Sequence, residues 1–321
     1  MSKQLKPRVA QVLSTYQLMR RFPDEQAAIN YLTPILWPGG PVCPFCNSSH
    51  ILTRQRKNFF FCSDCRKDFT IRVGTIFHRS HVSLHKWLYA MYLMVTARKG
   101  ISSLQLSKEI GVTQKTAWFL LSRIRAACGN QTKKILSGIV EVDETYIGGL
   151  EKNKHTSKKL RVGRGPVSKI PIIGMRDRNG QVTAHVTNST DSKALQGSIL
   201  DNVEAGSTVC TDEYRSYNGL NTVFTHNTIN HSAKQFVDGM AHTNGIESVW
   251  AVLKRGFYGT YHSFSEKHIP LYVDEFVFRL NEGNCAINTT DRLRSLAQGM
   301  KGQRLTYEML KQKIKYKIPK N

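Results

Sequence analysis

Apolar residues recur every three to four positions in the first part of the chain, and alternate or run together in the second part. The first pattern predicts helices over residues 22–37, 83–98, 102–110 and 114–127. The second pattern starts at Gly138 and is typical of short strands. We therefore expect a helical region and then a mixed α/β region, with the boundary near residue 135.

The mixed region is expected to hold a sheet flanked by helices. A short strand that ends at its carboxylate is predicted within residues 138–149. Further strands are predicted over 170–176, 181–186, 207–211 and 224–229, and helices over 190–203 and from Asn244 to Phe257. The Asn179-Gly180 step favours a tight hairpin between the second and third strands.

Residues 102–127 form a pattern of helix, tight turn and helix that fits a helix-turn-helix. Thr113 is expected to cap the second helix. The first turn of that helix would present Gln114, Lys115 and Thr116 to a DNA groove. Short helix pairs also occur in helical domains that do not bind DNA, so the motif alone leaves both interpretations open.

The charge of the chain favours the DNA interpretation. The 321 residues include 46 Lys and Arg against 23 Asp and Glu, a formal net charge of +23. Such an excess favours a polyanionic partner, with nucleic acid ahead of an anionic membrane surface. We find no apolar run of the roughly 18 residues that span a bilayer and no signal peptide. We expect a cytoplasmic protein whose seven cysteines are reduced.

Four of those cysteines have the spacing of a metal site. Cys43 and Cys46 form one C-x-x-C pair, and Cys62 and Cys65 form a second pair after fifteen intervening residues. This spacing predicts a β zinc ribbon with one structural Zn²⁺, and redox pairs or unliganded thiols are the alternatives. The predicted hairpin carries Arg54, Arg56 and Lys57 beside three phenylalanines, which suits nucleic-acid contact, although the phenylalanines could simply form a core.

Carboxylates follow apolar strands at two places in the mixed region. Asp143 lies in GIVEVDETYIGG and Asp212 in TDEYRSY, each where we expect the strand to end. Neighbouring strands would bring the two side chains to one rim, as a pair of hard cations requires. Glu247, with Asn244 one turn before it and Lys254 two turns after it, could complete that site from a helix. An edge strand, a turn-capping Asp212 and a solvated Glu247 are the alternatives.

A basic stretch over residues 152–169 has few apolar side chains to bury and is predicted to be a loop that contacts DNA backbone. Its candidate contacts are Lys158, Lys159 and Arg161.

The motifs WPGGPVCPFC, VEVDETYIGG, TDEYRSY, HTNGIESVWAVLKRGFYGTYH and KHIPLYVDEFVFRLN together resemble DDE transposases of bacterial insertion sequences, in the zinc-ribbon family numbered fifteen-ninety-five. The resemblance runs from about Phe22 to Asn281. It implies a ribonuclease H-like catalytic domain with Asp143, Asp212 and Glu247 as the acidic triad and Lys254 as the basic residue. Asn or His can replace Glu in that family, so Asn244 and His242 are alternative ligands.

The resemblance also implies a function and a domain plan. Two Mg²⁺ ions, or Mn²⁺, would support cleavage at inverted terminal repeats and joining of the 3′ ends to target DNA, by a homodimer or larger assembly without a membrane. The expected divisions are 1–80 (N-terminal helix and ribbon), 81–135 (helix-turn-helix), 136–285 (catalytic) and 286–321 (basic tail). A zinc-ribbon transcription regulator and a ribonuclease H-like nuclease or resolvase are the alternative functions.

Overall fold

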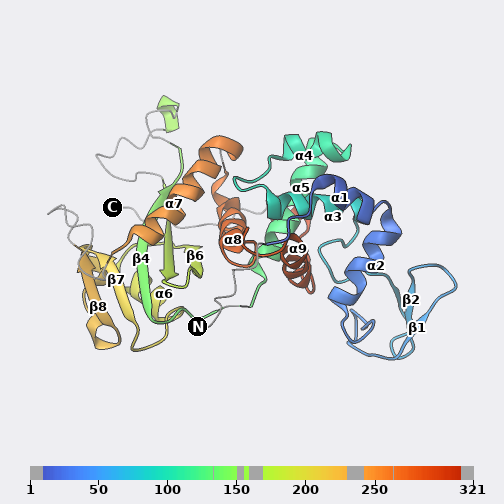
Figure 1. Ribbon diagram of the computed structural model, residues 1–321, viewed down its shortest axis with the longest axis horizontal. Helices are drawn as coiled ribbons and strands as arrows, with labels where there is room; N and C mark the ends of the chain where they lie inside the picture. Colours follow the sequence, from blue (N-terminus) through green and yellow to red (C-terminus); the bar gives the residue numbers. More distant parts are fainter. Residues whose placement is uncertain are drawn as a thin grey trace, which may run out of the picture. The chain divides into compact units, whose positions relative to one another are not determined.

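The computed structural model describes residues 10–132, 134–149, 155–158, 169–229, 242–262 and 264–311 (Figure 1). The chain divides into two compact units. The first comprises residues 1–131 and 282–309, and the second comprises 132–281 and 310–321. The second unit is thus inserted into the first along the sequence. None of the helices in the described ranges is long and apolar enough to cross a membrane.

The first unit contains a small sheet and a group of helices. Its elements are α1 (Thr15–Arg21), α2 (Glu25–Leu36), β1 (Ile51–Thr53), β2 (Phe60–Cys62), β3 (Asp68–Phe69), α3 (Leu84–Thr96), α4 (Ser103–Ile110), α5 (Gln114–Gly129) and α9 (Thr289–Gln298). A short helix, α10 (Tyr307–Lys311), crosses the later boundary between the units.

Local sequence explains where these helices begin. Asp24 and Thr113 accept hydrogen bonds from the backbone N–H three residues later, which satisfies a donor that the first helical turn leaves unpaired. Gly111 ends α4 in the left-handed conformation, with φ +62°, and α5 begins three residues later. The predicted helix, turn and helix are therefore present, with Thr113 as the cap.

The segment after Asn281 returns to the first unit and forms part of its core. Leu293, Leu296 and Met300 are fully buried, and α9 packs against α2, α3 and α5. The Arg123 guanidinium donates to Leu305 O at 3.0 Å, and Asn130 Nδ2 donates to Gly299 O at 2.9 Å. Residues 282–309, which include the first part of the expected basic tail, thus belong to the first unit.

The second unit has a five-stranded sheet and helices. Its elements are β4 (Ile139–Ile147), β5 (Ile170–Asp177), β6 (Val182–Val186), α6 (Ser192–Leu200), β7 (Thr208–Asp212), β8 (Thr225–Ile229), α7 (Asn244–Gly256), a π-helical turn (Phe257–Tyr261) and α8 (Ile269–Leu280). Single 3₁₀ turns occur at Thr156–Lys158, Arg215–Tyr217, Leu220–Thr222 and Glu266–His268.

The strand order is β6-β5-β4-β7-β8. The hairpin pair β5 and β6 and the pair β4 and β5 are antiparallel, whereas β7 and β8 run parallel to β4. This mixed sheet flanked by helices, preceded in the chain by a small β ribbon, confirms the predicted fold class. A short turn joins the antiparallel strands β5 and β6, whereas the connection from β6 to the parallel strand β7 contains α6.

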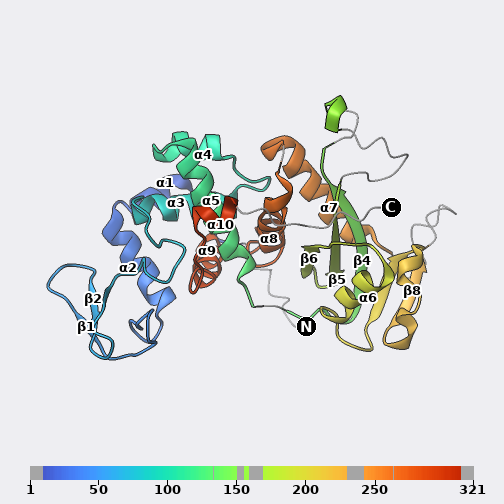
Figure 2. The same ribbon diagram turned by 180° about the vertical axis from the view of Figure 1, so that it is seen from behind.

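Side chains alternate across β4 and divide the second unit into two cores. Val140 and Val142 face the core that contains Leu195 and Ile199 of α6. The opposite face packs against α7 and α8 through Ile246, Trp250 and their neighbours. Figure 1 shows α7 lying across the sheet from one side, and Figure 2 shows α6 on the reverse side.

One expectation about β4 is wrong. Asp143 was expected at the end of its strand, but β4 continues to Ile147 and Asp143 lies in its middle. The reason is the antiparallel pairing with β5, which extends from Val140 to Ile147 and keeps β4 extended beyond the carboxylate. Thr145 and Ile147 are buried, so the later part of the strand is also fixed by packing.

We expect Leu296→Ala to lower the unfolding free energy of the first unit by about 2–5 kcal/mol, because a buried leucine is replaced by a cavity. The melting of the second unit should not change, because α9 belongs to the first unit. Differential scanning calorimetry on the full chain measures both transitions. Met309→Ala, at a half-exposed side chain, is the control. Equal shifts in both transitions would contradict the assignment of α9.

Candidate functional site

The candidate site lies where β4 and β7 separate. Their parallel pairing is limited to three residue pairs and ends at Glu141 opposite Cys210. Continuing the same register by two residues places Asp143 beside Asp212. Because paired residues of a sheet point to the same face, both carboxylates lie on the face that carries α7. The two acidic residues predicted from separate motifs are thus neighbours in the sheet.

Asp143 is half-buried and is held by two donors. The Glu144 N–H donates to Oδ1 at 2.8 Å, and the Trp250 indole N–H donates to Oδ2 at 3.0 Å. Burial, together with the negative charges of Asp212 and Glu247, raises the pKa of Asp143 to about 6 against the lowering effect of the two donors. Within the described residues neither Asp143 nor Asp212 forms an ion pair with Lys or Arg. Among the described residues, no Lys or Arg therefore balances the negative charges of Asp143 and Asp212.

Helix α7 supplies the third acidic residue. Glu247 lies in its first turn, is exposed, and accepts a hydrogen bond from the Thr243 hydroxyl at 3.3 Å. Its charge acts on Asp143. Asn244, the alternative ligand, is the first residue of α7 and is exposed. Lys254 is exposed in the last turn, about 10 Å along the helix axis from Glu247.

His242 makes different contacts from those expected of a rival ligand. Its Nδ1 lies 3.3 Å from Glu141 Oε1, and its Nε2 lies 2.6 Å from an Arg178 nitrogen. The same Arg178 nitrogen also lies 2.9 Å from Nδ1. The histidine therefore belongs to a partly buried cluster with Glu141 and Arg178.

The sequence analysis missed Trp250, whose indole reaches Asp143. A β-carbon on Gly174, the residue opposite Asp143 on β5, would lie 2.3 Å from the Trp250 ring. Glycine at that position leaves room for the indole to cross the sheet. The available sequence signal was an apolar residue three positions after Glu247, on the apolar face of the predicted helix.

Glu144 lies on the opposite face of β4 and faces a tyrosine. The Tyr217 hydroxyl donates to Glu144 Oε2. Burial, followed by the charges of Asp212 and Asp143, raises the pKa of Glu144 to about 7. This hydrogen bond ties the turn after Asp212 back to β4. Glu144 was expected to be a less probable ligand than Asp143, and its contact with Tyr217 is consistent with a structural role.

The chemistry of the acidic site fits a hard divalent cation. Asp143, Asp212 and Glu247 offer only carboxylate oxygens, the donors that Mg²⁺ selects, and their mutual repulsion would be relieved by a bound cation. Their ligand atoms do not all lie within 4.8 Å of one another; among the described residues only the four cysteines form such a group. Two ions about 3.5–4 Å apart require a wider spread of ligands than a single ion does.

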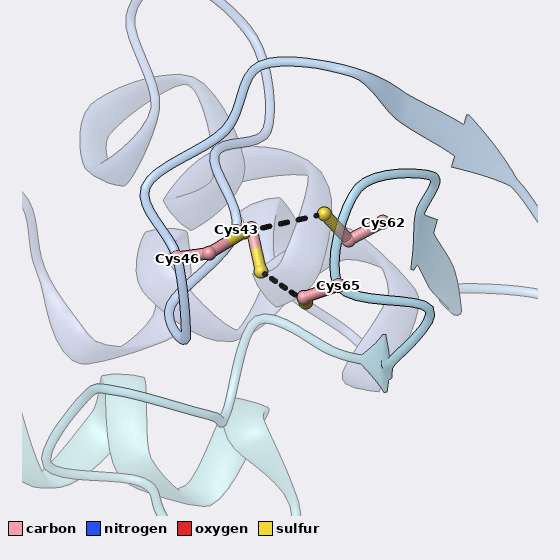
Figure 3. Close-up of side chains that lie close together, drawn as sticks. All are labelled: Cys43, Cys46, Cys62 and Cys65. Atoms are coloured by element: carbon pink, nitrogen blue, oxygen red, sulfur yellow. Dashed lines mark hydrogen bonds between the residues drawn. The ribbon is translucent and has the colours of Figure 1, made fainter.

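The four cysteine sulfurs lie together in the first unit, in two knuckle turns that face each other (Figure 3). Cys43 Sγ is 3.5 Å from Cys65 Sγ, and Cys46 Sγ is 3.5 Å from Cys62 Sγ. A tetrahedral zinc with bonds of about 2.3 Å sets sulfur separations of about 3.8 Å. The four thiols thus fit one structural zinc, and four sulfurs leave no position for substrate.

The ribbon hairpin presents arginines stacked on phenylalanines. The guanidinium carbons of Arg54 and Arg56 each lie 4.0 Å from the ring centres of Phe61 and Phe59. Phe60, between them, points inward and packs against Trp37, with the two ring centres 5.5 Å apart. Alternation therefore separates the two interpretations of the phenylalanines: the middle one is core, and the outer two hold cations at the surface. Lys57 is exposed in the same hairpin.

The other predicted DNA contacts lie on two further segments. Gln114 and Lys115 are exposed in the first turn of α5, and Lys115 Nζ lies 4.9 Å from the ring centre of Tyr307. Thr116 bonds to the cap residue Thr113. Lys158 is the last residue of a 3₁₀ turn, whereas Lys159 and Arg161 lie outside the described residues.

Family models match both parts of the chain. Residues 135–281 match the ISXO2-like transposase domain, and residues 23–68 match the transposase zinc-ribbon domain. The first match coincides closely with residues 132–281 of the second unit. The second match contains the four clustered cysteines.

Two curated relatives are similar in sequence. An uncharacterized protein in transposable element ISH50 of Halobacterium salinarum is 29% identical over 276 residues, covering 81% of this chain and 92% of the relative. An uncharacterized transposase-like protein of Haemophilus influenzae is 33% identical over 97 residues, covering 30% of this chain and 77% of the relative.

A solved structure also aligns with the chain at low similarity. It is a cryo-EM structure of a simian T-cell lymphotropic virus intasome in complex with PP2A regulatory subunit B56 gamma, at 16% identity and a TM-score of 0.28, covering 61% of this chain and 65% of that chain. That score is too low to carry an argument.

We expect Cys43→Ser to reduce bound zinc from one ion per chain to nearly none, because three thiolates and a hydroxyl hold zinc far less tightly than four thiolates. Metal analysis of the purified full chain measures the loss. Cys285→Ser, at an exposed cysteine outside the cluster, should retain the zinc. Full zinc content in the Cys43 variant would exclude the four-cysteine site.

Proposed function

Because this chain belongs to the insertion-sequence transposase family whose members join a transposase zinc ribbon to an ISXO2-like catalytic domain, we propose that it cuts DNA at transposon ends. It would then join the freed 3′ ends to target DNA. Inverted terminal repeats and target DNA are its substrates in this proposal.

The observation that supports this chemistry is that three carboxylates from three elements lie close enough for their negative charges to interact. Asp143 on β4 feels the charges of both Asp212 on β7 and Glu247 on α7. A regulator that only binds DNA has no use for a half-buried group of like charges, which costs stability unless a cation is bound there. The arrangement therefore favours a catalytic role over a purely DNA-binding one.

Each residue has a defined part in the proposed reaction. Asp143, Asp212 and Glu247 would hold two Mg²⁺ ions. When bound, such ions stabilise the attacking and leaving oxygens of an in-line displacement at phosphorus. The Trp250 N–H and the Glu144 backbone N–H fix the orientation of the Asp143 carboxylate. Glu247 is the third ligand in this proposal because its charge reaches Asp143.

The same residues would serve cleavage and joining in succession. Water attacks the phosphodiester first, and the DNA 3′-hydroxyl attacks the target later, so no side chain becomes covalently attached to DNA. Lys254, exposed at the far end of α7, would contact a phosphate near the reacting end as a point charge. Two transposon ends are processed together, so we propose at least a homodimer on DNA.

The first unit would bind the terminal repeats. The stacked Arg54 and Arg56, with Lys57, would contact backbone phosphates from the ribbon hairpin. Gln114, Lys115 and Thr116 would read bases from the start of α5. Lys158, with Lys159 and Arg161, would add salt-dependent contacts from the basic loop.

We expect Asp143→Asn or Asp212→Asn to reduce cleavage and joining of labelled terminal-repeat DNA in Mg²⁺ by at least about 1,000-fold, because each removes a charged metal ligand. Glu213→Gln, at the exposed residue next to Asp212, is the matched control and should retain wild-type rates. Wild-type rates in both Asp variants would refute the site. Cleavage without any joined product in the wild type would favour the nuclease or resolvase.

We expect Arg56→Ala to weaken binding to terminal-repeat and unrelated DNA by similar factors, because a phosphate contact carries no sequence information. The slope of log K against log salt should fall by about 1. Fluorescence anisotropy over a salt series measures both effects. Gln114→Ala should instead lower affinity for the terminal repeat alone. An unchanged salt slope in the Arg56 variant would exclude the phosphate contact.

A further inference from the structure

Glu141 is a buried carboxylate that the proposed mechanism does not use. Its side chain is only 3% exposed. One oxygen, Oε1, receives Arg178 and His242, and the other, Oε2, accepts the backbone N–H of Ile246 at 2.8 Å. Both oxygens are therefore occupied by donors from the protein. This leaves Glu141 poorly suited to bind metal, although it shares a face of β4 with Asp143.

The bond to Ile246 falls at a special place in α7. Ile246 is in the first turn, where backbone N–H groups have no partner within the helix. No side-chain cap is provided by the residue before the helix, Thr243. Glu141 thus takes the place of a local cap, but it does so from the neighbouring sheet. This hydrogen bond joins the start of the helix to a strand residue 105 positions earlier in the chain.

A second bond ties the same helix to the same strand one turn later. Trp250 Nε1 donates to Asp143 Oδ2. The two helix residues are four apart, about 6 Å along the axis, and the two strand residues are two apart, about 6.7 Å along the strand. These two rises match closely. Two bonds at matched spacing fix both the axial position and the rotation of α7 over β4, and Glu247 lies between them.

Gly245 is tightly packed beside the hydrogen bond between Ile246 and Glu141. A β-carbon on Gly245 would lie 2.7 Å from Glu141 Oε2 and 2.9 Å from Arg176 Nη1. Arg176, from β5, also donates to Gly245 O at 2.9 Å and so holds the helix start from the adjacent strand. A side chain at position 245 must displace either the helix start or the ends of the Glu141 and Arg176 side chains. The contact can therefore be disturbed without altering any charge.

We propose that Glu141 is a positioning residue that seats the start of α7 on β4 and thereby sets Glu247 against Asp143 for metal binding. This inference rests on the proposed metal-dependent function. Glu141 acts only through α7 and touches neither metal nor DNA. The Arg178 contact neutralises its buried charge, and the Ile246 contact transmits its position.

The test uses the full chain with Glu141→Ala, Gly245→Ala and the double variant. Gly197→Ala is the matched control, because a β-carbon there meets nothing within 4 Å in helix α6. Three quantities are measured: hydrogen exchange at the Ile246 amide, the Mg²⁺ concentration for half-maximal end cleavage, and the melting temperature. Asp143→Asn serves as the inactive reference.

We expect the wild-type Ile246 amide to exchange slowly and to lose its protection in both single variants. The Mg²⁺ requirement should rise about 10- to 100-fold, the usual effect of losing a group that orients a metal ligand. The double variant should be no worse than the more affected single variant, because both changes break one contact. Gly197→Ala should match the wild type in all three measurements.

Several outcomes would overturn the inference. Folded single variants with a wild-type Mg²⁺ requirement would show that Glu141 supports stability alone. Fast exchange of Ile246 in the wild type would exclude the bond itself. If the wild type shows no Mg²⁺-dependent cleavage, the proposed function fails, and amide exchange still decides whether Glu141 holds α7. If Glu141→Ala does not fold, Gly245→Ala carries the test because it leaves every charge in place.

Discussion

The early end of the pairing between β4 and β7 is the constraint on which the second unit depends. Past Glu141 and Cys210 the two strands separate, each remaining bound to its outer neighbour. Asp143 and Asp212 therefore lie at the same edge of the sheet, beyond the last paired residues of β4 and β7. Burial and like charge then raise the pKa of Asp143, and only a rigid surrounding can hold such a group in place. The bonds from Trp250 and from the Glu144 backbone supply that rigidity.

The zinc ribbon of the first unit faces a different constraint, because so small a segment buries too little surface to be stable alone. Its ribbon depends on four thiols that fit a zinc, and its helices depend on α9 from the far end of the chain. Buried arginines strengthen the packing of residues 282–309 against the earlier part of the first unit. The Arg123 guanidinium donates to three carbonyl oxygens, one of them Leu305 O, and so satisfies backbone groups that the irregular segment cannot pair internally.

Much of this architecture followed from sequence patterns. Periodicity gave the helices and strands, and cysteine spacing gave the cluster of four sulfurs. The position of Asp143 was misjudged because the pattern shows where a strand is apolar, not which neighbour keeps it extended. Trp250 was assigned only to the core because its spacing is that of a core residue and its N–H bond depends on Gly174 in another strand. The return of α9 rests on contacts between residues nearly two hundred positions apart, beyond the reach of local patterns.

The insertion of one unit into the other has a consequence for the order of folding during synthesis. Domains usually fold as they leave the ribosome, the N-terminal one first. Here the first unit lacks Leu293, Leu296 and Met300 of its core until residues 282–309 have been synthesised. All strands of the five-stranded sheet and the helices α6 to α8 have been made by Asn281. A nascent chain would therefore contain the mixed sheet before the core of the unit with the ribbon is complete.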